Sequence, residues 1–203
     1  MPKTPGLRFG ALGPEAWHLC IDLQRVFEPG APWSTPWLER IRPVAHSLCA
    51  LHPDRTVLTR FIPPARPEAA TGSWRRFYEK WSILTGLQAD PRWIELLPEF
   101  AALAPPAMVV DKPAYSPFCG TALHETLQAR SVESVILTGT ETDVCVLAAA
   151  LDAVDRGYRT IVVRDAICSS RDSTHDALMR LYHERFREQI EVVDSEELLQ
   201  DWR

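Results

Sequence analysis

The sequence predicts an α/β fold in which a six-stranded, mainly parallel, doubly wound sheet lies between two layers of helices. Six short segments have the composition of strands, several of them rich in Val and Ile, and segments with helical periodicity separate most of them. Several of the strand segments are continuous apolar runs, which indicates parallel strands buried on both faces. Because strands and helices alternate along the chain, we expect a three-layer αβα arrangement.

The predicted strands cover 17–23, 55–61, 107–112, 134–139, 160–166 and 190–194. The predicted helices cover 36–51, 120–130, 143–156 and 173–187, and a short helix after Asp194 follows the last strand. We expect Thr142 or Asp143 to cap the helix over 143–156 and Gly157 to end it.

The segment 62–106 interrupts this alternation. It contains several prolines and a cluster of aromatic residues, namely Trp74, Phe77, Tyr78 and Trp81. No shift in composition marks it as a separate domain, so we interpret 1–203 as a single domain with an insertion at about 62–106. Long insertions in compact domains often serve function, which favours a lid or a subunit contact. Extra packing against the edge of the sheet explains the segment equally well.

Composition excludes several classes of protein. The chain has 203 residues, of which 46% are hydrophobic and 24% charged, as in globular proteins. No run approaches the roughly 18–20 apolar residues that cross a bilayer, and the N-terminus lacks the apolar region of a secretory signal. We therefore expect a cytoplasmic protein without a membrane partner. The formal net charge of −5, without a basic block, argues against a nucleic-acid partner.

The chain has five cysteines, at positions 20, 49, 119, 145 and 168. Their number is odd and no CxxC spacing occurs, so the sequence indicates neither a disulfide framework nor a zinc site. Most of them are expected to be small buried residues with reduced thiols.

Three polar residues stand where predicted strands end, which is where open α/β sheets bind their ligands. Asp22 closes the first strand, Lys112 closes the third, and Cys145 lies in the first turn of the helix after the fourth. The helix dipole there favours a negative charge, so we expect a lowered thiol pKa at Cys145 and a reactive sulfur. Simple packing of Cys145 is the alternative. Asp22 and Lys112 equally fit an ordinary buried ion pair.

Four segments resemble the isochorismatase-like cysteine hydrolase family, which includes nicotinamidases and N-carbamoylsarcosine amidohydrolases. They are CIDLQRVF (20–27), KPAYSPFCGTAL (112–123), GTETDVCVLAAALDAVDRGY (139–158) and VVRDAICSS (162–170). The motifs occur in the family's order and, with the helix that carries His175, extend from residue 17 to about 194.

The resemblance implies that Cys145 attacks a substrate carbonyl and forms a thioester that water then hydrolyses. Asp22 is implied as the general base towards the thiol, and Lys112 as the group that orients Asp22 and stabilises the thiolate. It also implies a cis peptide between Thr140 and Glu141, which directs backbone N–H groups, including that of Cys145, at the oxyanion.

The substrate implied by this resemblance is a small amide, ureide or carbamoyl compound whose C–N bond is hydrolysed. Isochorismatases proper lack the cysteine nucleophile. Nicotinamidases carry a metal-binding D-x-H motif after the second strand, where this chain has TRFIPPARPEAATG (59–72), so we expect no metal and no other cofactor. The alternatives are a metal-assisted nicotinamidase and a non-catalytic binding member. Relatives of this kind also imply a homo-oligomer, either dimer or tetramer.

Loops near Cys145 supply the candidate substrate contacts, which are mostly aromatic. The predicted contacts are Phe27, Trp33, Arg60, Phe61, Trp81, Ser116 and Phe118. Further candidates from the same loops are Trp37, Ser169 and Ser170. Arg60 is a candidate partner for a substrate carboxylate, and a structural pair with an acidic neighbour is the alternative.

Overall fold

A computed structural model describes residues 6–202 and contains one six-stranded sheet whose neighbouring strands are all parallel. The strands are β1 (Ala16–Ile21), β2 (Thr56–Phe61), β3 (Met108–Lys112), β4 (Ser134–Thr140), β5 (Arg159–Cys168) and β6 (Ile190–Val193), in the spatial order β3-β2-β1-β4-β5-β6. The predicted fold class is therefore confirmed.

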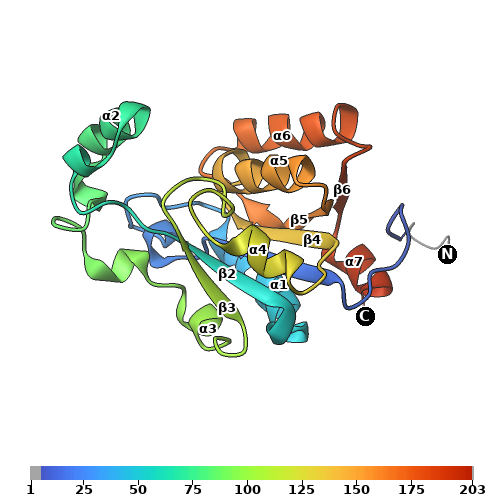
Figure 1. Cartoon of the computed structure of the whole chain (residues 1–203). Coiled ribbons are helices and arrows are strands. Elements are labelled where there is room, and N and C mark those ends of the chain that lie inside the picture. Colours follow the sequence, from blue (N-terminus) through green and yellow to red (C-terminus); the bar gives the residue numbers. More distant parts are fainter. Residues whose placement is uncertain (1–5, 203) are drawn as a thin grey trace.

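Helices cover both faces of the sheet (Figure 1). One face packs against α1 (Leu38–Leu51) and α7 (Ser195–Asp201), and the other against α4 (Leu123–Gln128), α5 (Leu147–Asp155) and α6 (Asp172–Glu184). Side chains of β1 alternate between the two layers: Ala16 and Cys20 belong to one apolar cluster, whereas Leu19 and Ile21 belong to the other. Burial on both faces explains the continuous apolar run of an inner strand such as β4, all of whose residues are buried.

His18 is a polar side chain of β1 that is fully buried. Its Nε2 atom lies 2.7 Å from the Thr138 hydroxyl on β4, and its Nδ1 atom has no hydrogen-bond partner in the described part of the chain. Burial disfavours the charged imidazolium and lowers the pKa of His18 from 6.5 to about 3. The folded protein therefore keeps this histidine neutral over a range in which the unfolded chain protonates it.

Acid is therefore expected to destabilise the fold from about pH 6.5 downwards. Between the two pKa values only the unfolded state binds the proton, so the free energy of unfolding decreases as the pH falls, by about 2 kcal/mol at pH 5. Urea unfolding at pH 7.5 and pH 5 measures this loss. A His18→Asn variant is expected to keep only the smaller loss caused by His52, whose pKa burial also lowers. An equal loss in this variant would mean that His18 is not its source.

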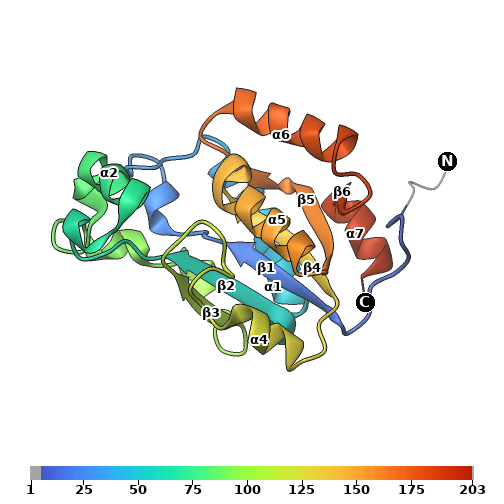
Figure 2. The ribbon, with the colours of Figure 1, turned by 45° about the horizontal axis from the view of Figure 1, so that its top comes forward.

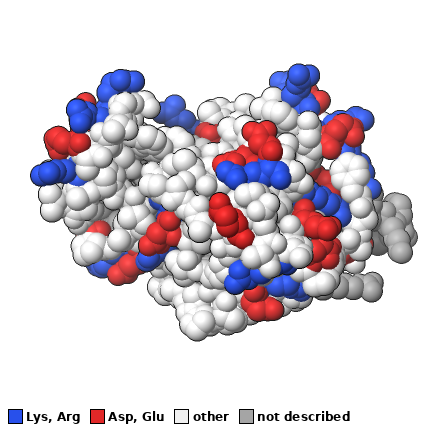
Figure 3. All heavy atoms as spheres, in the orientation of Figure 1, with Lys and Arg blue, Asp and Glu red and all other residues white. Residues whose placement is uncertain are grey.

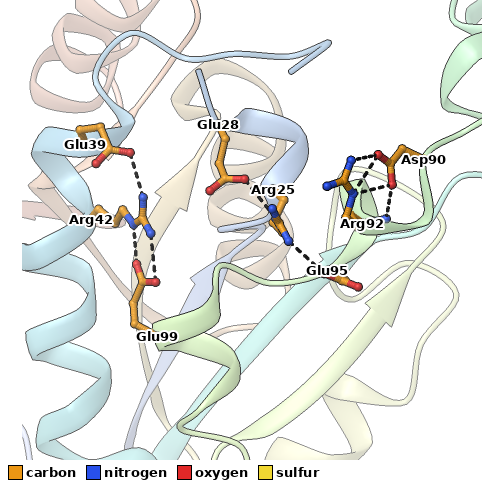
Figure 4. Close-up of polar contacts among 8 residues, drawn as sticks. All are labelled: Arg25, Glu28, Glu39, Arg42, Asp90, Arg92, Glu95 and Glu99. Carbon is orange, nitrogen blue, oxygen red and sulfur yellow. Dashed lines mark hydrogen bonds and ion pairs between the residues drawn. The ribbon is translucent and has the colours of Figure 1, made fainter. Parts of the chain in front are cut away.

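The segment 62–106 forms a lobe beyond one end of the sheet, with α2 (Gly72–Lys80) standing apart from the other helices (Figures 1 and 2). Its return arm, which includes α3 (Pro98–Ala101), is attached to the rest of the fold by ion pairs (Figure 4). Arg25 pairs with Glu95 at 3.4 Å, and Arg42 of α1 holds both carboxylate oxygens of Glu99. The Arg42 guanidinium lowers the pKa of Glu99, as expected for a carboxylate held in an ion pair.

The chain after β4 differs from the prediction. A π-helical turn over Thr142–Val146 precedes α5, so regular α-helix begins only at Leu147. Neither predicted cap residue caps the helix. Thr142 instead pairs its hydroxyl with His175 Nδ1 at 2.9 Å, and Asp143 accepts a hydrogen bond from Ser169. These contacts connect the turn to β5 and α6.

Acidic and basic side chains are interspersed over the face seen in Figure 3. Within residues 6–202, no helix is long and apolar enough to cross a membrane.

Candidate active site

The strand order reverses between β1 and β4, which places the chain segments after these two strands on either side of one crevice. Asp22 directly follows β1, and Cys145 lies in the π-helical turn after β4. The two strands approach each other closely at this end. A Cβ atom at Gly139 would lie 2.0 Å from the carbonyl oxygen of Ile21, and Gly139 has a φ of +106°. Only glycine fits there.

Asp22 is held in place by its neighbours and is fully buried. Its backbone has a φ of 48°, in the left-handed region. The Thr59 hydroxyl on β2 donates to Asp22 Oδ1 at 2.6 Å, and the Asp22 N–H donates to the same hydroxyl at 3.1 Å. The Thr140 hydroxyl donates to the Asp22 carbonyl at 3.0 Å. One carboxylate oxygen is therefore fixed by Thr59, which leaves Oδ2 for the remaining groups of the site.

Lys112 reaches this point from β3, which is two strands away from β1. Its Nζ atom lies 2.7 Å from Asp22 Oδ2 and 5.0 Å from the centre of the Phe61 ring on the intervening strand β2. Nζ also donates to the carbonyls of Ala114 and Tyr115, at 3.0 and 2.9 Å. Burial acts to lower the pKa of Lys112, but attraction to Asp22 and Cys145 outweighs it and raises the pKa, so the ammonium stays charged.

The Cys145 sulfur completes the cluster. Lys112 Nζ donates to Cys145 Sγ at 3.4 Å. Burial raises the pKa of the Cys145 thiol, and the Asp22 carboxylate raises it further, whereas Lys112 acts in the opposite direction. The expectation of a lowered pKa is therefore wrong for this state of the site, because the sequence shows the helix terminus but not the burial. A thiol in this position stays protonated until a base removes its proton.

Asp22 and Cys145 both open onto a cavity of about 420 Å³, a volume suited to a small organic molecule. Its wall is largely aromatic. The lining residues are Asp22, Phe27, Pro32, Trp33, Ser34, Phe61, Phe77, Trp81, Tyr115, Glu141, Val144, Cys145, Ser170 and Arg171.

Trp33 organises this wall. Its ring lies about 6 Å from four other aromatic rings, those of Phe27, Phe61, Phe77 and Trp81. Two of these rings belong to the 62–106 segment, so this segment forms one side of the cavity. Glu141 forms part of another side, and its Oε1 accepts the backbone N–H of Ser170 at 2.9 Å.

The structure brings together the three predicted catalytic residues, and Phe27, Trp33, Phe61 and Trp81 all line the cavity beside them. The peptide between Thr140 and Glu141 is cis, as the resemblance implied.

Three predicted substrate contacts do not line the cavity. Arg60 forms a two-pronged ion pair with Asp111 on β3, at 2.7 and 2.8 Å. Ser116 donates to Asp152, and Phe118 is buried and stacks on Tyr158. Each of these side chains has a structural partner that the sequence does not display.

Arg171 is the charged lining residue that the prediction missed. It is exposed at the cavity, and within residues 6–202 its guanidinium has no ion pair or hydrogen bond. It directly follows Ser170 in the loop after β5, at the same sheet edge as the catalytic cluster. The position of Arg171 just after a strand end could have indicated it as a lining residue, because the same reasoning had already suggested Ser169 and Ser170.

No group of three or more His, Cys, Asp or Glu side chains among the described residues is arranged to hold a metal ion. The acid groups near the cavity instead have partners of their own: Asp22 has Lys112 and Glu141 has the Ser170 backbone.

Comparison with known sequences gives two results. Residues 16–195 match the Isochorismatase domain. The chain is also 33% identical over 181 residues to a maleamate amidohydrolase of Pseudomonas putida, a match that covers 85% of this chain and 80% of that protein.

Solved structures with the same fold include a cysteine hydrolase from Pseudomonas syringae pv. phaseolicola, with a TM-score of 0.78 and 26% identity over 98% of this chain and 97% of that one. An N-carbamoylsarcosine amidase from Thermoplasma acidophilum has a TM-score of 0.68 and 25% identity, with 89% of this chain and 96% of that one covered.

Proposed function

The chain belongs to the isochorismatase family, and on that premise we propose that it is a cysteine-dependent hydrolase of a small amide, ureide or carbamoyl compound. The general class, an enzyme that hydrolyses carbon–nitrogen bonds, is that of its amidohydrolase relatives. The nucleophile, the base and the substrate class are the parts that we propose.

The first half of the reaction uses the cluster as follows. Asp22 accepts the proton of the Cys145 thiol, and the sulfur attacks the carbonyl carbon of the bound amide. The carbonyl electrons move to oxygen, where the backbone N–H of Cys145 stabilises the negative charge. Collapse of this intermediate expels the nitrogen, which takes the proton from Asp22 and leaves as ammonia or an amine. A thioester on Cys145 remains.

The second half regenerates the enzyme. Asp22 accepts a proton from water as the water attacks the thioester carbonyl. Collapse breaks the C–S bond, releases the carboxylic acid and returns the proton to sulfur. Lys112 stays charged throughout, because its raised pKa keeps its proton, and it lowers the energy of the thiolate in both halves.

The observation that carries this proposal is the contact of Lys112 with both Asp22 and Cys145, at 2.7 and 3.4 Å, beside a small cavity. The test is ammonia release from a panel of small carboxamides, ureides and carbamoyl compounds, measured with and without a metal chelator. Release that persists in chelator and disappears in an Asp22→Asn variant supports the proposal. Release that needs added metal would favour a metal-assisted amidase instead.

The position of Arg171 supports a substrate that carries a carboxylate. Two of the relatives are named for maleamate and N-carbamoylsarcosine, and both compounds contain a carboxylate besides the group that is hydrolysed. An exposed guanidinium at the cavity, without an acidic partner among residues 6–202, suits such a group. We therefore place the substrate carboxylate at Arg171 rather than at Arg60.

An Arg171→Gln variant is expected to raise KM for a monoamide of a dicarboxylic acid by about tenfold, since a hydrogen bond to a charged group is lost. The neutral diamide of the same acid should show little change. Arg60→Gln is the matched control, because Arg60 pairs with Asp111 outside the cavity and its loss should not change KM. Equal effects of Arg171→Gln on both substrates would rule out the carboxylate contact.

The remaining expectations concern the setting of the enzyme. The five cysteines are free, which fits a reducing compartment, and we keep the proposal of a cytoplasmic location. The proposals of a homo-oligomer, and of a single domain with an insertion at 62–106, rest on the sequence alone.

A further inference from the structure

Glu141 is a charged residue of the cavity wall that the proposed mechanism does not use. It stands between the cis peptide and the π-helical turn that carries Cys145. Its carbonyl accepts the backbone N–H groups of Val144 and Val146, each at 3.1 Å, and these two residues flank Cys145 in the chain. Its side chain lines the same cavity as Asp22 and Cys145. The backbone of Glu141 is therefore fixed beside the nucleophile.

The carboxylate of Glu141 has one oxygen with a partner and one without. Oε1 accepts the backbone N–H of Ser170 at 2.9 Å, which fixes the direction of the side chain. Oε2 has no hydrogen bond or ion pair within residues 6–202, and it is not one of the fully buried atoms that lack a partner there. Since the residue is partly buried and lines the cavity, Oε2 is the oxygen that a ligand can reach. A carboxylate oxygen only accepts hydrogen bonds, so such a ligand must supply a donor.

Glu141 and Arg171 carry opposite charges at one cavity, yet in the described part of the chain they form no ion pair with each other. Glu141 is bonded to the backbone of Ser170, the residue directly before Arg171. The charge of Glu141 acts within the cavity: burial raises the pKa of Tyr115, and negative charges on Cys145 and Glu141 raise it further. Ligand cavities are mostly apolar and use a few polar groups to orient their ligand. These two charges therefore suit a ligand with an acidic group for Arg171 and a hydrogen-bond donor for Glu141.

The polar groups of a bound amide already have partners in the proposed mechanism, with one exception. The carbonyl oxygen faces the backbone N–H of Cys145, the substrate carboxylate faces Arg171, and the leaving nitrogen takes its proton from Asp22. In a simple monoamide the other substituent of the carbonyl is a carbon atom, which donates nothing. In a ureide it is a second nitrogen, and the N–H group of that nitrogen is a donor without a partner.

We propose that Glu141 Oε2 accepts a hydrogen bond from this second N–H group, and that the substrate is a ureido acid whose carboxylate lies at Arg171. This inference rests on the proposed function. The bond that breaks is the one to the terminal nitrogen, which leaves as ammonia while a thiocarbamate remains on Cys145. Water releases the thiocarbamate as a carbamic acid, which loses carbon dioxide and gives the free amine.

The test uses compounds of similar length that differ at this N–H group. N-carbamoylglycine has the group, succinamate has a methylene in its place, and N-carbamoylsarcosine has an N-methyl group there. L-asparagine, which is succinamate with an added ammonium group, is included as a charged donor. Dissociation constants measured by calorimetry in a Cys145→Ala background report binding without turnover. KM for ammonia release by the active enzyme gives a second reading.

A Glu141→Gln variant is expected to bind N-carbamoylglycine about tenfold more weakly or worse, because a hydrogen bond to a charged group is lost. The glutamine oxygen can still accept the Ser170 N–H, but an NH2 group, which is a donor, replaces Oε2. Binding of succinamate and N-carbamoylsarcosine should not change. Asp143→Asn is the matched control, because it removes a carboxylate from the same π-helical turn. Asp143 bonds to Ser169 and does not line the cavity, so its loss should weaken none of the compounds selectively.

The possible outcomes separate the two proposals. If the hydrolase releases ammonia but Glu141→Gln binds N-carbamoylglycine unchanged, or binds all the compounds equally more weakly, the Glu141 contact is wrong and the hydrolase assignment stands. A loss confined to L-asparagine would overturn the ureide in favour of an amino-acid amide. Parent enzyme that binds succinamate as tightly as N-carbamoylglycine would also overturn the contact. Ammonia release that persists in Cys145→Ala would overturn the proposed mechanism instead.

Discussion

Replacing Cys145 with alanine is expected to lower kcat by about ten-thousand-fold or more, which is the size of effect seen when an enzyme loses its only nucleophile. Ammonia release at saturating substrate measures it. The fold should survive, because the change removes one sulfur atom from an apolar cluster, and circular dichroism checks this.

The same loss is expected for Asp22→Asn, for a reason that the structure makes specific. Burial and the Asp22 charge raise the pKa of the Cys145 thiol, so thiolate is scarce at neutral pH, and in the proposed mechanism Asp22 removes the proton during the reaction. An asparagine accepts no proton. Removing either residue therefore blocks the first step, and the double variant should be no slower than either single variant.

Cys168→Ala is the matched control for the loss of a buried thiol. Cys168 is 3% exposed, burial raises its pKa to about 12, and its sulfur donates a hydrogen bond to Thr35. It has no contact with Asp22 or Lys112 among the described residues and should leave kcat nearly unchanged. Full activity of Cys145→Ala, or an equal loss in Cys168→Ala, would contradict the assignment.

The cluster itself could be predicted from the sequence because its members lie at strand ends. Parallel strands place all their carboxyl ends at one edge, which made a cluster of Asp22, Lys112 and Cys145 possible, and the family resemblance implied it. The strand boundaries differ from the prediction by at most about two residues, since Val- and Ile-rich runs define them well. The thiol pKa was predicted in the wrong direction because it depends on burial, which only the packed structure reveals.

The sequence did not show which of two arginines, Arg60 or Arg171, lies at the cavity. Arg60 leaves β2 and looked available, but it faces Asp111 in the register that pairs β2 with β3. Aligning the ends of the two predicted strands would have revealed this pair. Phe77 belongs to the 62–106 segment, where no regular periodicity indicates which side chains point inward. Its place in the wall follows from how this segment folds back onto Trp33.

Replacing Lys112 is expected to have a second large effect, on stability as well as on catalysis. Lys112→Met is expected to abolish turnover and to lower the free energy of unfolding by about 3–5 kcal/mol, as is typical when one partner of a buried ion pair is removed. The Lys112 side chain is fully buried, and its ammonium holds Asp22 Oδ2 and two backbone carbonyls. Methionine fills the space but leaves the Asp22 carboxylate without its counter-charge and the two carbonyls without their donor. Urea unfolding of the purified variant measures the loss.

A double variant, Asp22→Asn with Lys112→Met, distinguishes the ion pair from packing. If the loss in Lys112→Met comes mainly from the uncompensated Asp22 carboxylate, removing that charge should recover about 1–3 kcal/mol, although the two carbonyls stay unsatisfied. Strictly additive losses would mean that Lys112 stabilises the fold through its carbonyl contacts rather than through Asp22. In either case the double variant stays inactive, because it has neither base nor cation beside Cys145. Recovered stability without recovered activity would show that the pair is retained for catalysis, since a neutral pair would then serve the fold nearly as well.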